Sequence, residues 1–236
     1  MIETLKREIS ELGYMTLQKT CVMKPHKYDK EYFDFWCKKK ASYTYLDKDK
    51  IYVLFLDGKN VTKNHKLYNL LDEKGFTYIL HQSAKTVMEN YEIESLVYTG
   101  IDEVSVIFKD TRYLSSVFGE AGCINTIMQI IEQKILKLLV KQNINTEIRG
   151  SMFGIEKGEE ESYIDYRKKV VYDLGLTYYA KEFMKPDKYH ELSGNGIIEN
   201  LKNVGLYEDF IKRKYLYEGY FSDLSFIHDI DYNSLF

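Results

Sequence analysis

Acidic residues lie at the ends of two apolar, strand-like stretches of this sequence. Asp57 closes the stretch IYVLFLDG, and Asp102 and Glu103 lie inside SLVYTGIDEVSVIF. A carboxylate at the end of one buried strand and an acidic pair at the turn of a neighbouring hairpin would bring several oxygen atoms together. Such a group suits two Mg²⁺ ions about 3.5–4 Å apart, which stabilise the attacking and leaving oxygens in phosphoryl or nucleotidyl transfer. The acids therefore predict metal-assisted phosphate chemistry.

Each acidic motif also has a simpler explanation. Asp57-Gly58 is one of the commonest turn dipeptides, and an acidic pair beside a hairpin turn is ordinarily solvated. The joint pattern carries more weight than either motif alone. If the first strand lies beside the hairpin in one sheet, the three acids meet at one place.

The elements around the acids follow the order strand, helix, hairpin, helix, strand. A continuous apolar stretch of strand length is typical of a strand buried on both faces, and apolar residues at helical spacing indicate helices packed on a sheet. This order predicts an α+β fold with the ferredoxin-like palm of polymerases and nucleotide cyclases. The expected elements are a strand over 51–56, a helix over 78–90, hairpin strands over 96–98 and 104–108, a helix over 114–140 and a strand from 146.

The chain divides into three expected parts. Residues 1–50 form an N-terminal extension of unknown role, 51–155 form the palm catalytic domain, and 156–236 form a helical and β extension packed on the palm. Within the last part we expect a charged helix over 160–183. After it we expect a short helix over 197–203, bracketed by glycines, and two Tyr-rich strands within 215–226.

Composition narrows the compartment and the class of protein. Of the 236 residues, 44% are hydrophobic and 29% charged, and no apolar stretch approaches the roughly 20 residues that span a bilayer. The N-terminal sequence lacks the continuous apolar segment of a signal peptide. Cys21, Cys37 and Cys123 show no C-x-x-C spacing, so neither a disulfide framework nor a zinc site is indicated. We expect a cytoplasmic protein without membrane attachment.

A formal net charge of −3 provides no overall attraction to nucleic acid. Any contact with RNA must use local patches, and 38–40, 167–169 and 212–214 each place three basic residues near tyrosines that could stack on bases. Solvated helix faces are the alternative explanation for each patch.

Six blocks of the sequence, taken together, resemble a known family. In chain order they are FLDGK (55–59), SAKTVMEN (83–90), YTGIDEVS (98–105), NTEIRGSMF (145–153), EEESYIDYRK (159–168) and the segment from LSGNG to KRKYLYEGY (192–220). This order is similar to that of the tRNA-His guanylyltransferases and their relatives, which polymerise nucleotides in the 3′-to-5′ direction. The resemblance covers the chain from Ile51 to Tyr220.

The resemblance implies roles for individual residues. Asp57 and Asp102 would be the shared ligands of two Mg²⁺ ions, with the Gly58 carbonyl as a further ligand and Glu103 in support. The residues implied to contact the triphosphate of GTP or ATP are Lys59, Asn60, Val61, Thr62, Lys63 and Lys66. The residues implied to contact RNA are Arg149, Arg167 and Lys168.

The sequence departs from the family pattern at several positions. Ile101 stands where the family has Ser, Phe55 where it has Arg, and Val61-Thr62 where it has Phe-His. The family signature His-Ile-Asn-Asn-Leu-Tyr-Asn falls on YDLGLTY (172–178), which keeps the Leu but no His or Asn. The metal-binding acids are retained while nucleotide selection has changed, so we expect a divergent substrate.

The leading hypothesis is a divergent Mg²⁺-dependent nucleotidyltransferase that adds or repairs nucleotides at the 5′ end of tRNA or a related RNA. Its relatives form dimers or tetramers, so the resemblance also implies a homo-oligomer. One alternative is a palm-type nucleotide cyclase or oligonucleotide synthase, which needs the same two acids but no RNA. The other is a catalytically degenerate RNA-binding module that keeps the palm fold.

Overall fold

A computed structural model describes residues 46–47, 49–59, 61, 75–118, 124–183 and 194–226 of the chain. The expected N-terminal extension lies almost entirely outside these residues. The described helices are α4 (Phe76–Asn90), α5 (Thr111–Phe118), α6 (Ile124–Lys141), α7 (Glu160–Phe183), α8 (Gly194–Asn203) and α9 (Tyr207–Lys212), with a 3-10 helix η4 (Lys214–Leu216).

The described strands form one antiparallel sheet in the order β4-β1-β3-β2-β5. The first four strands and the helices α4 and α6 between them give the ferredoxin-like arrangement, so the α+β palm fold predicted from the sequence is confirmed. The strands are β1 (Ile51–Lys59), β2 (Ser95–Gly100), β3 (Glu103–Phe108), β4 (Glu147–Ile155) and β5 (Tyr220–Leu224).

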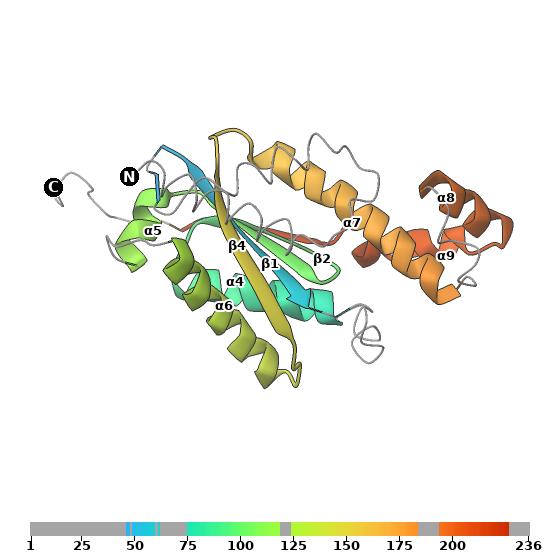
Figure 1. Ribbon diagram of the computed structural model, residues 1–236, viewed down its shortest axis with the longest axis horizontal. Coiled ribbons are helices and arrows are strands. Elements are labelled where there is room, and N and C mark those ends of the chain that lie inside the picture. The colour runs from blue at the N-terminus through green and yellow to red at the C-terminus, as the bar shows by residue number, and fades with distance from the viewer. Residues whose placement is uncertain are drawn as a thin grey trace, which may run out of the picture.

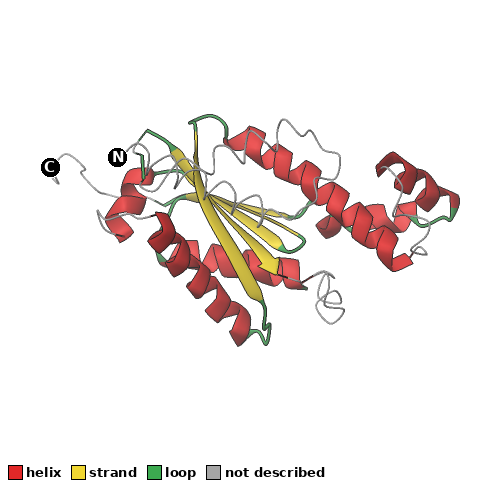
Figure 2. Cartoon of the chain, viewed as in Figure 1, coloured by secondary structure: helices red, strands yellow, loops and turns green. Residues whose placement is uncertain are grey.

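Both faces of the sheet are covered by helices. On β1, Tyr52, Leu54 and Leu56 are fully buried in the core that includes α4 and α6. The alternate residues Ile51 and Val53 pack in a second cluster with the first turns of α7. Figures 1 and 2 show α7 on the opposite side of the sheet from α4 and α6. This double burial is the physical reason for the continuous apolar stretch in β1.

The edge strand β5 is fixed to the sheet by a buried histidine of α4. The two ring nitrogens of His81 lie 3.0 Å from the Thr99 hydroxyl of β2 and 2.9 Å from the Ser222 hydroxyl of β5. Burial, and then the charge of Lys85, lowers the pKa of His81 to about 4. The ring is therefore neutral at physiological pH and ties α4, β2 and β5 together.

Two expectations about element boundaries were wrong. In place of the single helix expected over 114–140, the structure has α5, which begins at Thr111 and ends at Phe118, and α6, which begins at Ile124. Two strands were expected within 215–226, but the structure has η4 followed by β5. The turn between them requires Gly219, because its φ is +70° and a Cβ there would lie 2.3 Å from the Thr99 carbonyl oxygen.

Helices α8, α9 and η4 pack around the second half of α7 to form a lobe beside the sheet (Figure 1). The rings of Tyr172, Phe210 and Tyr217 meet at its centre, with centroids 5.4–6.0 Å apart. Within the described part of the chain, no helix combines the length and the apolar character needed to cross a lipid bilayer.

Replacement of Gly175 by alanine tests the packing of α7 on η4. Alanine normally stabilises a helix interior by about 0.5–1 kcal/mol relative to glycine. Here the added Cβ would lie 1.9 Å from the carbonyl oxygen of Leu216. We expect Gly175→Ala to lower the free energy of unfolding by about 1–3 kcal/mol in urea denaturation, the usual cost of overpacking. Lys137→Ala, at an exposed position of α6, is the control; a more stable Gly175→Ala protein would contradict the close approach.

Candidate active site

The three predicted acids meet where β1 ends beside the β2–β3 turn. Asp57 is the cross-strand partner of Glu103 in the antiparallel pairing of β1 with β3. One residue further, the Gly58 N–H donates a hydrogen bond of 2.7 Å to the carbonyl oxygen of Asp102. The end of β1 is thus joined by backbone contacts to the start of β3, as the strand order predicted from the sequence requires.

Glycine is required at position 58 by this contact. A Cβ there would lie 3.0 Å from the Asp102 carbonyl oxygen and 2.6 Å from a methyl group of Val61. Val61 itself is fully buried and belongs to the main core. Gly58 and the buried side chain of Val61 therefore pack against each other beside the turn that carries Asp102.

The turn between β2 and β3 is held in an uncommon backbone conformation. Ile101 has φ of +52°, a region that β-branched residues rarely adopt. Its side chain is fully buried, and its carbonyl accepts a hydrogen bond of 2.5 Å from the Thr77 hydroxyl of α4. Such strain costs about 1–3 kcal/mol and persists only where the surroundings compensate for it. Burial and the bond from Thr77 thus hold Asp102 in place.

Arg167 of α7 forms a buried ion pair with Glu103 at the start of β3. Its Nε donates a 3.0 Å hydrogen bond to one carboxylate oxygen and its Nη2 contacts the other. The guanidinium lies over the Phe55 ring, 4.7 Å from the centroid. Only 7% of Arg167 and 2% of Glu103 are exposed. The pair connects α7 to the acidic turn on the face of the sheet that α7 covers.

The surroundings of Asp102 hold more negative than positive charge. Burial, and then the charges of Asp57 and Glu103, raise the pKa of Asp102 well above its usual value. A backbone hydrogen bond and the charge of Arg167 act in the opposite direction without cancelling the rise. A further cation bound near Asp57 and Asp102 would stabilise the charged form of both.

A complete protein cage for a metal is absent, because no group of three or more His, Cys, Asp or Glu side chains among the described residues could hold an ion. Glu103 is paired with Arg167, and the other oxygen atoms at this end of the sheet are the carboxylates of Asp57 and Asp102 and the carbonyl of Gly58. Mg²⁺ is commonly bound by one or two carboxylates together with substrate phosphates. The donor set therefore fits Mg²⁺ that is shared with a phosphate-bearing substrate.

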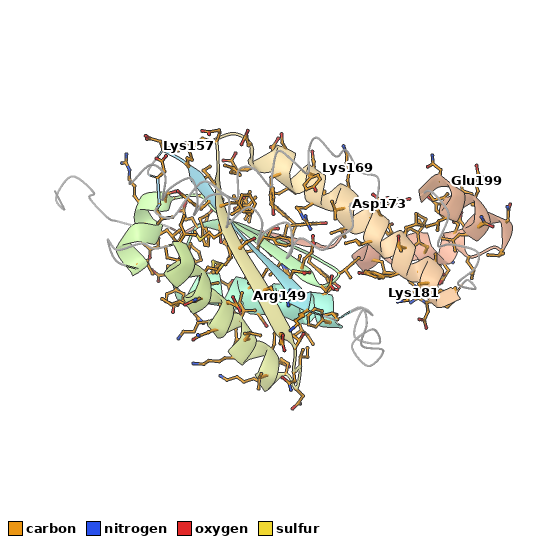
Figure 3. All side chains as sticks on the ribbon, viewed as in Figure 1. Arg149, Lys157, Lys169, Asp173, Lys181 and Glu199 are labelled. Atoms are coloured by element: carbon orange, nitrogen blue, oxygen red, sulfur yellow. The ribbon has the colours of Figure 1, made fainter. Side chains whose placement is uncertain are left out.

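The basic residues predicted for the site have different surroundings. Arg149 is exposed on β4 as the cross-strand partner of Asp57 (Figure 3), so a basic group lies beside the acids. Lys59 forms an ion pair with Glu147 of β4, and Lys168 is exposed with its amine 3.4 Å from Asp165. Arg167, predicted to contact RNA, points instead into the protein against Glu103. Asn60, Thr62, Lys63 and Lys66 lie outside the described residues.

Sequence reasoning did not identify the residues that support this turn. Phe55 was noted only as a departure from the family pattern, but its ring lies under the Arg167 guanidinium. Tyr163 of α7 shares a buried 2.9 Å hydrogen bond with Ser105 of β3. The position of Phe55 beside the site could have been predicted, because alternate residues of a strand face the same side of the sheet and Phe55 is two residues before Asp57.

The comparisons with known proteins reveal likeness in structure only. No protein-family model matches the sequence, and no curated protein matches it. The tRNA(His) guanylyltransferase of Saccharomyces cerevisiae has a TM-score of 0.53 at 14% identity, over 80% of this chain and 93% of that one. A bacterial tRNA(His) guanylyltransferase-like protein in complex with ATP has a TM-score of 0.52 at 15% identity, over 74% of this chain and 79% of that one. The chain therefore has the palm fold of these proteins.

Removal of Arg167 tests the ion pair. Arg167→Met leaves Glu103 as an uncompensated buried charge, so we expect the free energy of unfolding to fall by about 3–5 kcal/mol. The double variant Arg167→Met/Glu103→Gln should lose less than the sum of the two single variants, measured as a double-mutant cycle in urea. Additive losses would show that the two side chains do not interact in solution.

Stability as a function of pH tests the charge excess at Asp102. Its raised pKa means that the folded protein holds this proton more tightly than the unfolded chain, so stability falls as pH rises through the folded pKa. In metal-free buffer, Asp102→Asn should be more stable than the parent at pH 7, with the difference disappearing below about pH 4. Glu147→Gln is the control, because Lys59 lowers the pKa of Glu147 and the charged form therefore stabilises the folded protein. This variant should be less stable than the parent at pH 7. An Asp102→Asn protein less stable at pH 7 would contradict the charge excess.

Proposed function

We propose that this protein is a Mg²⁺-dependent nucleotidyltransferase that adds nucleotides to the 5′ end of tRNA or a related RNA, in the 3′-to-5′ direction. The observation that carries the proposal is the contact between Gly58 and the Asp102 carbonyl, which brings Asp57 and Asp102 together. This pair lies in a palm fold shared with a tRNA(His) guanylyltransferase and with a tRNA(His) guanylyltransferase-like protein that is described in complex with ATP.

Asp57 and Asp102 would bind Mg²⁺ together with the Gly58 carbonyl. When bound, the metal neutralises phosphate charge and lowers the barrier to displacement at phosphorus. Arg149, beside Asp57 on β4, would pair with a phosphate oxygen. Glu103 and Arg167 act as positioning residues, because their ion pair holds the turn that carries Asp102.

The triphosphate of GTP or ATP would lie against the backbone N–H groups from Lys59 to Thr62, with Lys63 and Lys66 as cationic partners. Lys168, exposed on α7, remains the proposed RNA contact of this helix. In this proposal residues 51–155 carry the chemistry and 156–236 present RNA to it. We also expect a homodimer or homotetramer, which sedimentation velocity would measure.

A nucleotide incorporation assay tests the proposal. The parent, incubated with labelled GTP or ATP, Mg²⁺ and tRNA transcripts lacking the 5′-terminal nucleotide, should extend the RNA at its 5′ end. Asp57→Asn and Asp102→Asn should each reduce the rate at least about 100-fold, which is about 2.7 kcal/mol of transition-state stabilisation. Glu199→Gln is the matched control, because Figure 3 shows Glu199 at the far end of the lobe from Arg149.

The same assay separates the alternatives. Cyclic or oligomeric products formed without RNA, and lost in the same two variants, would identify a cyclase or an oligonucleotide synthase. RNA binding without any product, unchanged by Asp57→Asn and Asp102→Asn, would identify a binding module. EDTA should abolish incorporation by the parent, because the proposed mechanism requires Mg²⁺.

A further inference from the structure

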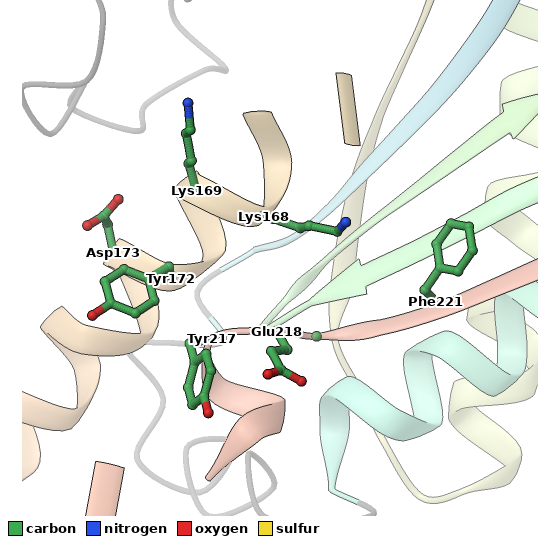
Figure 4. A pocket seen from close by; sticks show the side chains of 8 residues that line it. Lys168, Lys169, Tyr172, Asp173, Tyr217, Glu218 and Phe221 are labelled. Atoms are coloured by element: carbon green, nitrogen blue, oxygen red, sulfur yellow. The ribbon is translucent and has the colours of Figure 1, made fainter. Parts of the chain in front are cut away.

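A second concave site lies between α7 and the segment that leads from η4 into β5. It has a volume of about 620 Å³ and opens to solvent. We call it the α7–β5 cleft (Figure 4). Its lining residues come from two segments far apart in the sequence: Lys168, Lys169, Tyr172 and Asp173 of α7, and Tyr217, Glu218, Gly219 and Phe221.

The cleft combines aromatic rings with opposite charges. Phe221 is 52% exposed on the edge strand, an apolar ring presented to solvent at the mouth of the cleft. Figure 4 shows Lys168 extending from α7 toward the side where Phe221 lies. The two lysines and the carboxylates of Asp173 and Glu218 bring the formal charge of the lining to zero. A lining without net charge attracts a free triphosphate only weakly. A nucleotide with a single phosphate suits it better, because its base can stack on the rings and its phosphate can pair with a lysine.

The cleft adjoins the candidate active site along β2. Phe221 pairs with Tyr98 across the β2–β5 ladder, and Tyr98 pairs with Ser105 of β3, whose hydroxyl contacts Tyr163 of α7. Phe221 therefore lies on the α7 face of the sheet. Gly219 packs against Thr99, which is separated from the turn residue Ile101 only by Gly100. Lys168 follows Arg167, which binds Glu103.

A buried hydroxyl lies beside Gly219, one of the residues that line the cleft. Tyr98 is 1% exposed, and its hydroxyl has no hydrogen-bond partner among the described residues. A Cβ at Gly219 would lie 3.2 Å from this oxygen. A buried polar group without a partner is costly, and this one lies next to the backbone that lines the cleft.

We propose that the α7–β5 cleft binds one unpaired nucleotide of a single-stranded RNA segment. The base stacks on Phe221, and the backbone phosphate pairs with Lys168 or Lys169. Asp173 and Glu218 accept hydrogen bonds from ribose hydroxyls, which distinguish RNA from DNA. This inference rests on the proposed function in one respect, that the partner is RNA. It assigns to the lobe the task of holding a frayed RNA end next to Asp102.

Binding of a short fluorescein-labelled single-stranded RNA, measured by anisotropy in EDTA, tests the cleft without catalysis. Phe221→Ser and Lys168→Ala should each weaken binding about tenfold, as expected for loss of one stacked base or one phosphate contact. Phe183→Ser and Lys181→Ala are the matched controls, because both residues are exposed on α7 outside the cleft. These two variants should bind RNA like the parent.

Several outcomes would overturn the inference. The parent could fail to bind the RNA, or could bind it no more tightly than the cleft variants do. The parent could also bind blunt duplex RNA or DNA as tightly as single-stranded RNA. Finally, ATP could displace the RNA at a concentration similar to that of the RNA. Self-association lost in Phe221→Ser would instead identify a second copy of the chain as the occupant. Cleft-dependent RNA binding without nucleotide incorporation would contradict the proposed function and leave this inference standing.

Discussion

The ion pair between Arg167 and Glu103 is the interaction on which the candidate active site depends. Three carboxylates meet at one end of the sheet, and two of them, Asp102 and Glu103, are buried. Arg167 neutralises one of these charges, stacks on Phe55 and connects α7 to β3. A buried ion pair contributes little net stability compared with apolar packing, but loss of one partner is costly. The pair therefore specifies where α7 lies.

The apolar core supports this polar site from both sides. Alternate residues of β1 pack against α4 and α6 on one face and against α7 on the other, so β1 is held along most of its length. The acidic turn is fixed at its base by buried Ile101 and by the hydrogen bond from Thr77. Asp57 and Asp102 are thus positioned by rigid elements, which is the arrangement that metal-assisted chemistry needs.

The palm fold does not by itself identify a reaction, because one fold can support many functions. The carboxylates that fit a metal are brought together by a backbone contact that only glycine at position 58 allows. Segment 172–178, where the sequence departs from the resemblance, lies on α7 and contributes Tyr172 and Asp173 to the α7–β5 cleft.

The sequence by itself determined the strands, the hairpin, most of the helices and the meeting of the three acids. These depend on local hydrophobic periodicity and on a strand order that follows from connection rules. Only the tertiary structure decided that Arg167 turns inward, that Lys59 pairs with Glu147 and that a cleft forms beside β5. The partners in these two ion pairs are 64 and 88 residues apart. Side-chain pairing over such distances depends on how helices and strands pack, which local sequence patterns do not encode.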